Sequence, residues 1–411
     1  MNKFQDTNDV RRPEVGKKKK HRVHKVLLII LSCMLLIALL LWCGWHFIDK
    51  LYTPHQNTLP PRNEDESPSN ENEEQTTEDD GYRTVVANDP NSDKTRREGI
   101  YTFLIVGRDH VALNTDVIMI ASFDVTNSRV TVIQIPRDTY VERWGYPHKI
   151  NSIFGIAYSD AYRTGSDDQT RDGMLELAST ISENIGLPID FYVMVNLEGF
   201  RNIIDVLGGV DIYVPFHMVY EDPEQDLYID LPEGQTHLDG EKAEQFVRFR
   251  KGYYRADLGR LNAQRVFLSA LAEQLKESLT GLTAVSTASR MAEQAFRYVS
   301  TDLTALDFVY FAKAFLKVDI SDVRMTQLPG EAIYSYGVSY FGINRNDTVA
   351  MLGEYFNCFT EPFTDEDFDP KYAFVNNNDQ DFMKTYSKET IGAEFDSADD
   401  IAAGGLDEPH F

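Results

Sequence analysis

A dense group of cationic side chains stands out between Phe246 and Arg265 of a chain whose formal net charge is -25. The group consists of Arg248, Arg250, Lys251, Arg255, Arg260 and Arg265, with Asp257 as the single acid. Arg248 and Arg250 are two residues apart, so in an extended segment their guanidinium groups point to the same side. On a helix that begins near Asp257, the residues Asp257, Arg260 and Gln264 share a polar face.

This combination of planar guanidinium forks and an amide suits a ligand with several anionic oxygens, most simply a pyrophosphate. The same composition also fits a solvated charged surface, or arginines paired with structural carboxylates. The arginines by themselves therefore leave an anion site and an ordinary charged face both open.

Further polar residues stand where strands are predicted to begin or end. Asp109 follows the first predicted strand, Asp116 opens the second, and Arg137 closes the third. Asp109 and Asp116 could share Mg²⁺, or Mn²⁺ in its place, because Mg²⁺ favours one or two carboxylates completed by phosphate oxygens and water. Arg137 would add another guanidinium to an anion site. Turn and strand-start positions are also common places for Asp, which is the competing interpretation.

The elements that must position these residues alternate between strand and helix patterns. Short β-branched runs predict strands over residues 101–107, 116–124, 129–137, 191–196 and 210–215. Helical periodicity with glycine stops predicts helices over residues 173–186 and 197–209, and a third helix begins near Asp257. Beyond it, a helix over 303–318 and a strand over 322–330 are predicted. This order favours an α/β fold, a layered α-β-α sandwich around a central mixed sheet.

An apolar run precedes the predicted domain. Residues 26–48 contain no Asp, Glu, Lys or Arg and are long enough to cross a hydrocarbon core of about 30 Å as a helix. A basic stretch precedes the run, and Trp42 and Trp45 lie near its far end. We therefore expect a single transmembrane helix with a cytoplasmic N-terminus and an extracellular domain. A cleaved signal peptide is the competing interpretation, and the length of the run argues against it.

Composition divides the rest of the chain. We expect a cytoplasmic basic tail over 1–25, the transmembrane helix over 26–48, an acidic disordered stalk over 49–98, an extracellular folded domain over 99–360 and an acidic disordered tail over 361–411. Cys33 and Cys43 lie in the apolar run, which leaves Cys358 alone in the part that folds in water. No intrachain disulfide framework is available there.

The order of several segments resembles the LytR-CpsA-Psr family of cell-wall phosphotransferases. The matching segments are "FLIVGRD", "NTDVIMIASFD", "VTVIQIPRDTYV", "HKINSIFGIAY", "LPIDFYVMVNLEGFRNIIDVLGGVDIYVP", "GQTHLDGEKAEQFVRFRK" and "ADLGRLNAQR". The resemblance implies a membrane-anchored, Mg-dependent extracytoplasmic transferase. Such an enzyme moves a glycopolymer, a teichoic acid or a capsular or secondary wall polysaccharide, from a polyprenyl-pyrophosphate carrier to peptidoglycan, forming a phosphodiester.

The resemblance also implies roles for single residues. The metal-site acids fall on Asp109 and Asp116, the pyrophosphate-binding and catalytic residues on Arg137, Arg248, Arg250 and Asp257, and the substrate-binding positions on Lys149, Asn151, Arg260 and Gln264. Where the family pattern has Arg-Ser before the second aspartate, this chain has Asn114-Thr115, so one anion contact is either missing or supplied by Arg108. Asp109 or Asp257 would serve as the base.

Phosphoryl transfer suits these residue types, because the protein mainly positions groups and stabilises charge on phosphate oxygens. Two other function classes remain open at this point. The domain could bind lipid-linked glycan without turning it over, as a regulator, or it could be a pyrophosphatase that uses water in place of the sugar hydroxyl. A nucleic-acid partner is disfavoured by the acidic tails and the outward topology.

Overall fold

The computed structural model describes residues 52–56, 94–108, 113–223, 227–250, 252–253, 257–279, 299–335, 337–356, 358–364, 384–385 and 396–397, together with parts of 287–298. The chain divides into two compact units, Met1–Pro54 and His55–Phe411, and the fold belongs to the second. The predicted transmembrane helix over 26–48 lies outside the described residues, as does most of the predicted stalk and tail. Among the helices that are described, none has the length and apolar character needed to span a bilayer.

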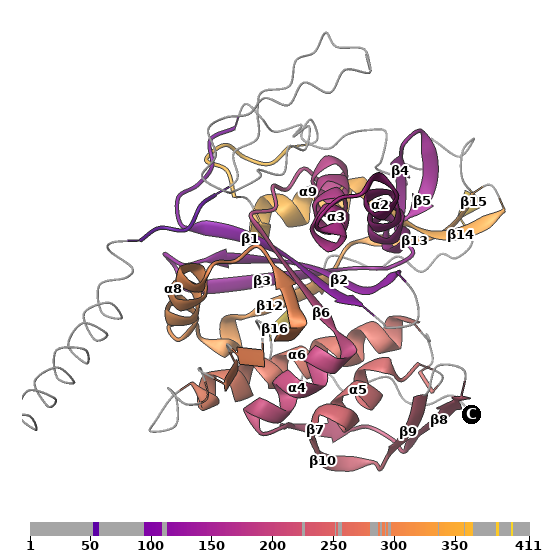
Figure 1. The fold of residues 1–411 in the computed structure, drawn as a ribbon, viewed down its shortest axis with the longest axis vertical. Helices are drawn as coiled ribbons and strands as arrows, with labels where there is room; N and C mark the ends of the chain where they lie inside the picture. Colours follow the sequence, from indigo (N-terminus) through magenta and orange to yellow (C-terminus); the bar gives the residue numbers. More distant parts are fainter. Residues whose placement is uncertain are drawn as a thin grey trace, which may run out of the picture. The chain divides into compact units, whose positions relative to one another are not determined.

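The core of the fold is a mixed seven-stranded sheet in the order β11-β6-β1-β2-β3-β12-β16 (Figure 1). β1 pairs antiparallel with β2 and parallel with β6, while β3 pairs antiparallel with β2 and parallel with β12. The strands are β1 (Ile100–Arg108), β2 (Thr115–Asp124), β3 (Arg129–Ile135), β6 (Phe191–Asn196), β11 (Val299–Thr301), β12 (Arg324–Gln327) and β16 (Asp396–Ser397).

Alternation along the strands gives the sheet two apolar faces. On β1, Leu104 and Val106 belong to a buried cluster with α2 (Ile150–Thr164) and α3 (Gln169–Ile185). Tyr101 and Phe103 face the other way and pack with α8 (Ala305–Phe315) and part of α6 (Asp257–Ser278). Helices therefore cover both faces, which confirms the predicted α/β fold with a central mixed sheet.

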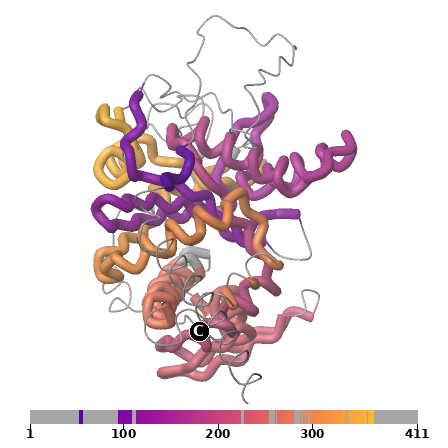
Figure 2. Tube along the Cα trace, turned by 60° about the vertical axis from the view of Figure 1, so that its left-hand side comes forward, coloured from indigo at the N-terminus to yellow at the C-terminus, as the bar shows by residue number. Residues whose placement is uncertain are grey.

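A second apolar cluster is built by side chains from α4 through α6. Its elements lie on one side of the sheet in both views (Figures 1 and 2). Phe246 of α5 and Phe267 of α6 lie fully inside it. Its elements are α4 (Leu197–Leu207), β7 (Val210–Val214), β8 (Met218–Asp222), β9 (Leu227–Leu231), β10 (Gly234–Leu238) and α5 (Gly240–Arg248). Because α6 contributes to this cluster and to the sheet face, it joins the two parts.

Smaller elements complete the fold. The hairpin of β4 (Tyr140–Arg143) and β5 (Tyr146–Lys149) leads directly into α2. The remaining elements are η2 (Ile320–Asp322), β13 (Gly330–Ser335), β14 (Val338–Ile343), α9 (Arg345–Met351), η3 (Leu352–Phe356) and β15 (Lys384–Thr385).

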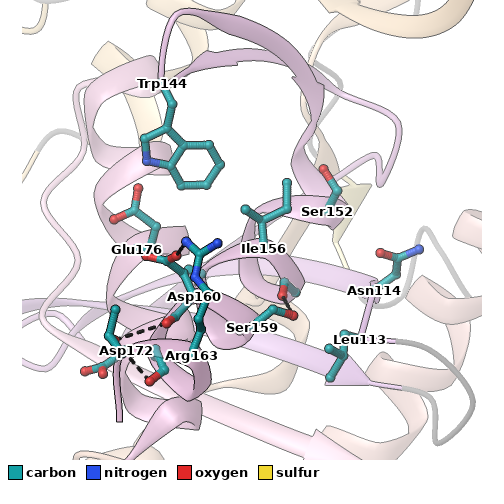
Figure 3. Close-up of a pocket in the computed structure, with 14 residues that line it drawn as sticks. Leu113, Asn114, Trp144, Ser152, Ile156, Ser159, Asp160, Arg163, Asp172 and Glu176 are labelled. Carbon is teal, nitrogen blue, oxygen red and sulfur yellow. Dashed lines mark hydrogen bonds and ion pairs between the residues drawn. The ribbon is translucent and has the colours of Figure 1, made fainter. Parts of the chain in front are cut away.

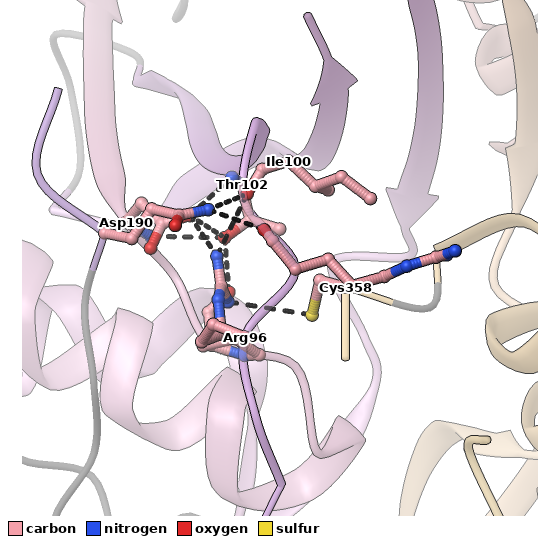
Figure 4. Close-up of polar contacts among 8 residues, drawn as sticks. Arg96, Ile100, Thr102, Asp190 and Cys358 are labelled. Atoms are coloured by element: carbon pink, nitrogen blue, oxygen red, sulfur yellow. Dashed lines mark hydrogen bonds and ion pairs between the residues drawn. The ribbon is translucent and has the colours of Figure 1, made fainter. Parts of the chain in front are cut away.

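A buried ion pair holds residues ahead of β1 against the sheet (Figure 4). Arg96 Nη2 lies 2.7 Å from Asp190 Oδ2, and the two side chains are 8% and 0% exposed. The same carboxylate oxygen accepts hydrogen bonds from the backbone N–H and the hydroxyl of Thr102, at 2.8 and 3.0 Å. Arg96 also donates to the Sγ of Cys358 at 3.6 Å. The folded region therefore begins before residue 99, the start expected from composition.

Most predicted elements are confirmed, and one alternative that the sequence left open is decided. The three strands of the first β-meander, the helix stopped by Gly186 and the helix stopped by Gly208-Gly209 all form as expected. The sequence allows either a helix or a strand that ends near Lys251, and the structure has a helix there. α5 ends at Arg248, and only the next residues are extended, because Phe249 takes β-region dihedrals and packs into the second cluster.

Candidate functional site

Two of the polar residues predicted from strand ends, Asp116 and Arg137, lie together at one edge of the sheet. β1 ends at Arg108, which lies opposite Thr115, the first residue of β2, in the antiparallel register. β3 ends at Ile135, two residues before Arg137. The antiparallel pairing of these strands therefore brings Arg108, Asp116 and Arg137 together although 29 positions separate the outermost pair in the sequence numbering.

Asp116 and Arg137 form an ion pair at this edge. Arg137 Nη1 lies 2.8 Å from Asp116 Oδ1, and the two side chains are 27% and 40% exposed, respectively. An ion pair in contact with solvent contributes only about 0–1 kcal/mol to stability. An incoming anion can therefore compete for the guanidinium at little cost to the fold.

The start of α2 adds a second cation. β5 ends at Lys149, whose Nζ lies 2.8 Å from Asp138 Oδ1. The backbone N–H of Asn151 donates to the carbonyl of Arg137 at 3.2 Å. The hydroxyl of Thr115 donates to the carbonyl of Asn151 at 3.4 Å. These bonds fix the beginning of α2 against the ends of β2 and β3.

Arg108 lies over two aromatic rings of α2. Its guanidinium carbon is 5.7 Å from the ring centroid of Phe154 and 5.7 Å from that of Tyr158. Cation–π contacts of this kind hold a guanidinium over a ring without consuming its hydrogen-bond donors. This placement supports the expectation that Arg108 lies close enough to Asp116 and Arg137 to contact the same ligand.

The arginine segment at the end of α5 is positioned by a buried acid. Arg248 Nη1 lies 2.8 Å from Oε1 of Glu244, four residues earlier on the same helix. Arg201 of α4 reaches the other oxygen of Glu244 at 3.1 Å. The Arg248 side chain is 16% exposed, whereas Arg250 is exposed just beyond the helix. Glu244 thus orients Arg248, and Arg250 projects toward solvent.

Gln264 connects the arginine segment to the sheet. Its Oε1 accepts a hydrogen bond from Nε2 of Gln134 on β3 at 2.7 Å, and its Nε2 donates to the carbonyl of Val247 at 3.1 Å. Gln134 and Gln264 are 2% and 7% exposed. The amide predicted to bind substrate is therefore engaged at both ends with protein, three residues from Arg137 on one side and one residue from Arg248 on the other.

Part of the predicted site lies outside the described residues. These are Asp109, Lys251, Arg255 and the side chain of Asp257, of which only the helical backbone is described, while Arg260 lies half-buried in the first turns of α6. Within the residues that are described, no group of three or more His, Cys, Asp or Glu could enclose a metal ion. Asp116 is a partly exposed oxygen donor, which suits a hard divalent cation held by two carboxylates, phosphate oxygens and water.

Three residues at the site had not been predicted. Glu244 could have been found, because it precedes Arg248 by four positions on a predictable helix. Asp138 and Gln134 carry no such signal, since a hairpin brings Lys149 to Asp138, and α6 brings Gln264 to Gln134.

Comparison with known proteins agrees with this geometry. The chain is 28% identical over 220 residues to the polyisoprenyl-teichoic acid–peptidoglycan teichoic acid transferase TagV of Bacillus subtilis, covering 52% of this chain and 52% of that protein. It is 29% identical over 260 residues to the cell wall biosynthesis protein LcpA of Corynebacterium glutamicum, covering 59% and 48%. The chain thus spans about half the length of these curated relatives.

A solved structure shows the same fold. The crystal structure of protein gbs0355 from Streptococcus agalactiae superposes with a TM-score of 0.51 at 16% sequence identity, covering 61% of this chain and 84% of that chain. The model of the LytR_cpsA_psr family matches residues 63–356, which include six of the seven strands of the sheet, the second cluster and every site residue described above. The chain therefore belongs to the LytR_cpsA_psr family.

Proposed function

We propose that this protein transfers a glycopolymer from a polyprenyl-pyrophosphate carrier to peptidoglycan. The observation that carries the proposal is the edge at which Asp116, Arg137, Arg108 and Lys149 gather, linked through Gln264 to the arginine segment of α5. Teichoic acid and peptidoglycan are the substrates in the name of the TagV relative, which supports this choice of donor and acceptor class.

In the proposed reaction an acceptor hydroxyl attacks the phosphorus that carries the glycan. The bond between that phosphorus and the bridging oxygen breaks, the new phosphodiester joins glycan to acceptor, and polyprenyl monophosphate leaves. The hydroxyl proton passes to a carboxylate, for which the sequence offers Asp109 and Asp257. Arg137, Arg248 and Arg250 bind the phosphate oxygens and stabilise the charge that develops on them.

Asp116 and Asp109 would hold Mg²⁺, or Mn²⁺, which when bound neutralises charge on the pyrophosphate oxygens. Arg137 can pass from Asp116 to the substrate because their ion pair is partly exposed. Gln264 and Glu244 act through the arginines as positioning residues. Lys149 and Asn151 lie at the start of α2, where they can contact the head group of the donor.

The test is transfer from a short-chain polyprenyl-pyrophosphate glycan to peptidoglycan oligomers. Arg137→Lys and Arg250→Lys keep the charge but lose the planar fork, and a lost charge-assisted hydrogen bond of about 1.5–3 kcal/mol predicts roughly ten- to hundredfold slower turnover. Arg129→Lys, at an exposed position at the start of β3, is the control. Equal activity of all three variants would refute the anion site.

The metal is tested separately. Asp116→Ala should abolish the response of transfer to added Mg²⁺ while leaving the melting temperature nearly unchanged, since the Asp116 side chain is 40% exposed. Wild-type Mg²⁺ dependence in this variant would exclude Asp116 as a ligand.

Product analysis separates the proposal from its two alternatives. Polymer linked through a phosphodiester indicates transfer, free polymer phosphate indicates a pyrophosphatase, and unchanged carrier indicates a binding or regulatory protein. We further propose that residues 26–48 anchor the chain with the domain outside the cell. Protease added to intact protoplasts should then digest the domain after Leu51, whereas a protected domain would refute this topology.

A further inference from the structure

An open groove of about 950 Å³ runs along α2 (Figure 3). It lies next to the edge of the sheet that holds Asp116 and Arg137. α2 contributes Ser152, Ile156, Ser159, Asp160 and Arg163, which follow one another at helical spacing on one face. The helix rises about 16 Å from Ser152 to Arg163, which suits an extended oligosaccharide better than a single sugar.

One end of the groove meets the proposed catalytic edge. Asn114 and Ser152 line this end, and their chain neighbours Thr115 and Asn151 share the hydrogen bond described above. Gly155 permits the close approach, because a Cβ at that position would lie 2.8 Å from the carbonyl oxygen of Leu113. A ligand in the groove would therefore present one end to the edge that holds Asp116 and Arg137.

Trp144 overhangs the groove from the β4–β5 hairpin (Figure 3). Its side chain is 47% exposed, and its ring contacts that of His148 edge to face at a centroid distance of 5.4 Å. Arg143, the preceding residue, forms ion pairs with Glu176 and Glu183 of α3. The hairpin is thus fastened to α3, and the indole is held over the groove.

The backbone at Trp144 is unfavourable for a large side chain. Trp144 and Gly145 are the two loop residues of the hairpin, and their φ angles are 53° and 77°. Positive φ at both positions defines a type I′ turn, for which Asn-Gly is the preferred pair. A bulky residue in this region is strained, and strain of this kind is concentrated at functional sites.

The charge of the groove indicates which substrate it can take. Its lining holds three carboxylates, Asp160, Asp172 and Glu176, against the single guanidinium of Arg163. Partial burial lowers the pKa of His148 below 6.5, so the neighbouring imidazole is neutral at pH 7. Asp160 is paired with Arg163, and Glu176 with Arg143, so the lining has no excess positive charge to hold a polyanionic donor polymer. An aromatic ring above hydroxyl, amide and carboxylate groups suits the apolar faces and hydroxyls of sugars.

We propose that this groove binds the acceptor, a glycan strand of peptidoglycan, with the indole of Trp144 stacked on a sugar ring and the attacking hydroxyl at the Asn114–Ser152 end. This inference rests on the transferase function proposed above and assigns the acceptor subsite within it. The groove and the anion site are built from different residues, so they can be tested apart.

Trp144 provides its own probe, because the chain has three tryptophans and the other two, Trp42 and Trp45, lie in the predicted anchor. In full-length protein carrying Trp42→Phe and Trp45→Phe, purified in detergent, Trp144 is the single indole. Stem-free peptidoglycan oligosaccharides should change its emission saturably without donor or metal present. Poly(glycerol phosphate) should not. An equal response to the polyanion, or no response to the oligosaccharide, would overturn the proposal.

Substitution of Trp144 gives a second test of glycan binding in the groove. Trp144→Asn places the preferred pair in the turn, so its melting temperature should be no lower than that of wild type, while calorimetric binding of the oligosaccharide falls at least about tenfold. Tyr162→Ala is the matched control, since Tyr162 is a 74% exposed aromatic of α2 that does not line the groove. Equal loss in both variants, or in neither, would refute a specific groove.

The two proposals fail in different ways. If the protein catalyses no transfer but Trp144 still responds to the oligosaccharide, the proposed transferase function is refuted and glycan binding in the groove is supported. If transfer occurs and Trp144→Asn leaves the KM for the acceptor unchanged, the groove falls alone.

Discussion

Substitution of Gln264 can distinguish two roles for this residue: contact with the substrate, and a hydrogen-bonded connection between β3 and the end of α5. The family resemblance predicts that it binds substrate, whereas the structure shows both ends of its amide bonded to protein. Gln264→Leu keeps a similar volume and removes both hydrogen bonds. We expect this variant to be less stable and also slower in transfer, because Val247 adjoins Arg248 and loses its tie to β3.

The magnitude follows from burial. Gln264 and Gln134 are 7% and 2% exposed, and their mutual hydrogen bond is 2.7 Å long. Each lost hydrogen bond removes about 0.5–1.5 kcal/mol net, and a buried donor left without a partner, here Nε2 of Gln134, adds about 1–3 kcal/mol. Gln264→Leu removes two such bonds and should therefore lower the free energy of unfolding by about 2–6 kcal/mol.

A double-mutant cycle measures the interaction energy between Gln134 and Gln264 directly. Gln134→Leu, Gln264→Leu and the double variant are unfolded in urea, and the two single effects are compared with the combined one. Replacing both amides by apolar groups removes the orphaned donor, so the double variant should recover about 1–3 kcal/mol relative to additivity. Transfer should stay low in all three variants, because none restores the tie between β3 and the end of α5.

A direct contact between Gln264 and substrate would give a different pattern. If Gln264 contacts substrate and not Gln134, then Gln264→Leu should raise the KM for the donor at unchanged stability, Gln134→Leu should leave the KM as it is, and the two substitutions should be additive. That pattern would refute the structural role and support the role implied by the family resemblance.

Two further predictions concern stability. Burial raises the pKa of Asp302 to about 6 from an ordinary 3.8, so its contribution to stability is lost as pH rises between these values. Asp302→Asn should therefore stabilise the protein by up to about 3 kcal/mol at pH 7.5 and change it little near pH 4, measured by urea unfolding at both pH values. Arg96→Met leaves the carboxylate of Asp190, which is 0% exposed, without its countercharge and should cost about 3–5 kcal/mol in the same assay. Arg163→Met, in an ion pair that is 80% exposed at Arg163, should cost less than about 1 kcal/mol, and equal costs would show that burial does not govern the Arg96 pair.

Local patterns in the sequence were sufficient for the central strands and several helices. The strands over 101–107 and 116–124 are signalled by β-branched runs, and the ends of α3 and α4 by Gly186 and Gly208, which take φ angles of 73° and 87°. These strands and helix ends depend on residues within a few positions of one another, so they can be predicted from the local sequence. The family followed from the order of several short segments, and the family model confirms it.

The residues of the candidate site could be predicted only in part from the sequence. Asp116 and Arg137 were singled out because strand ends favour polar chemistry, but their ion pair depends on the antiparallel register of β2 with β3. The end of α5 is less sharply signalled, because Phe249, which is buried in the second cluster, caps the helix in place of a glycine or proline.

Contacts between distant segments were decided by the tertiary structure alone. Gln264 meets Gln134 across 130 positions, and Trp144 reaches α2 and α3 only because a type I′ hairpin folds back over them. The sequence determines which residues can do chemistry, through their types and local spacing. Sheet register and helix packing determine which of them meet, because those depend on burying apolar faces contributed by the whole chain.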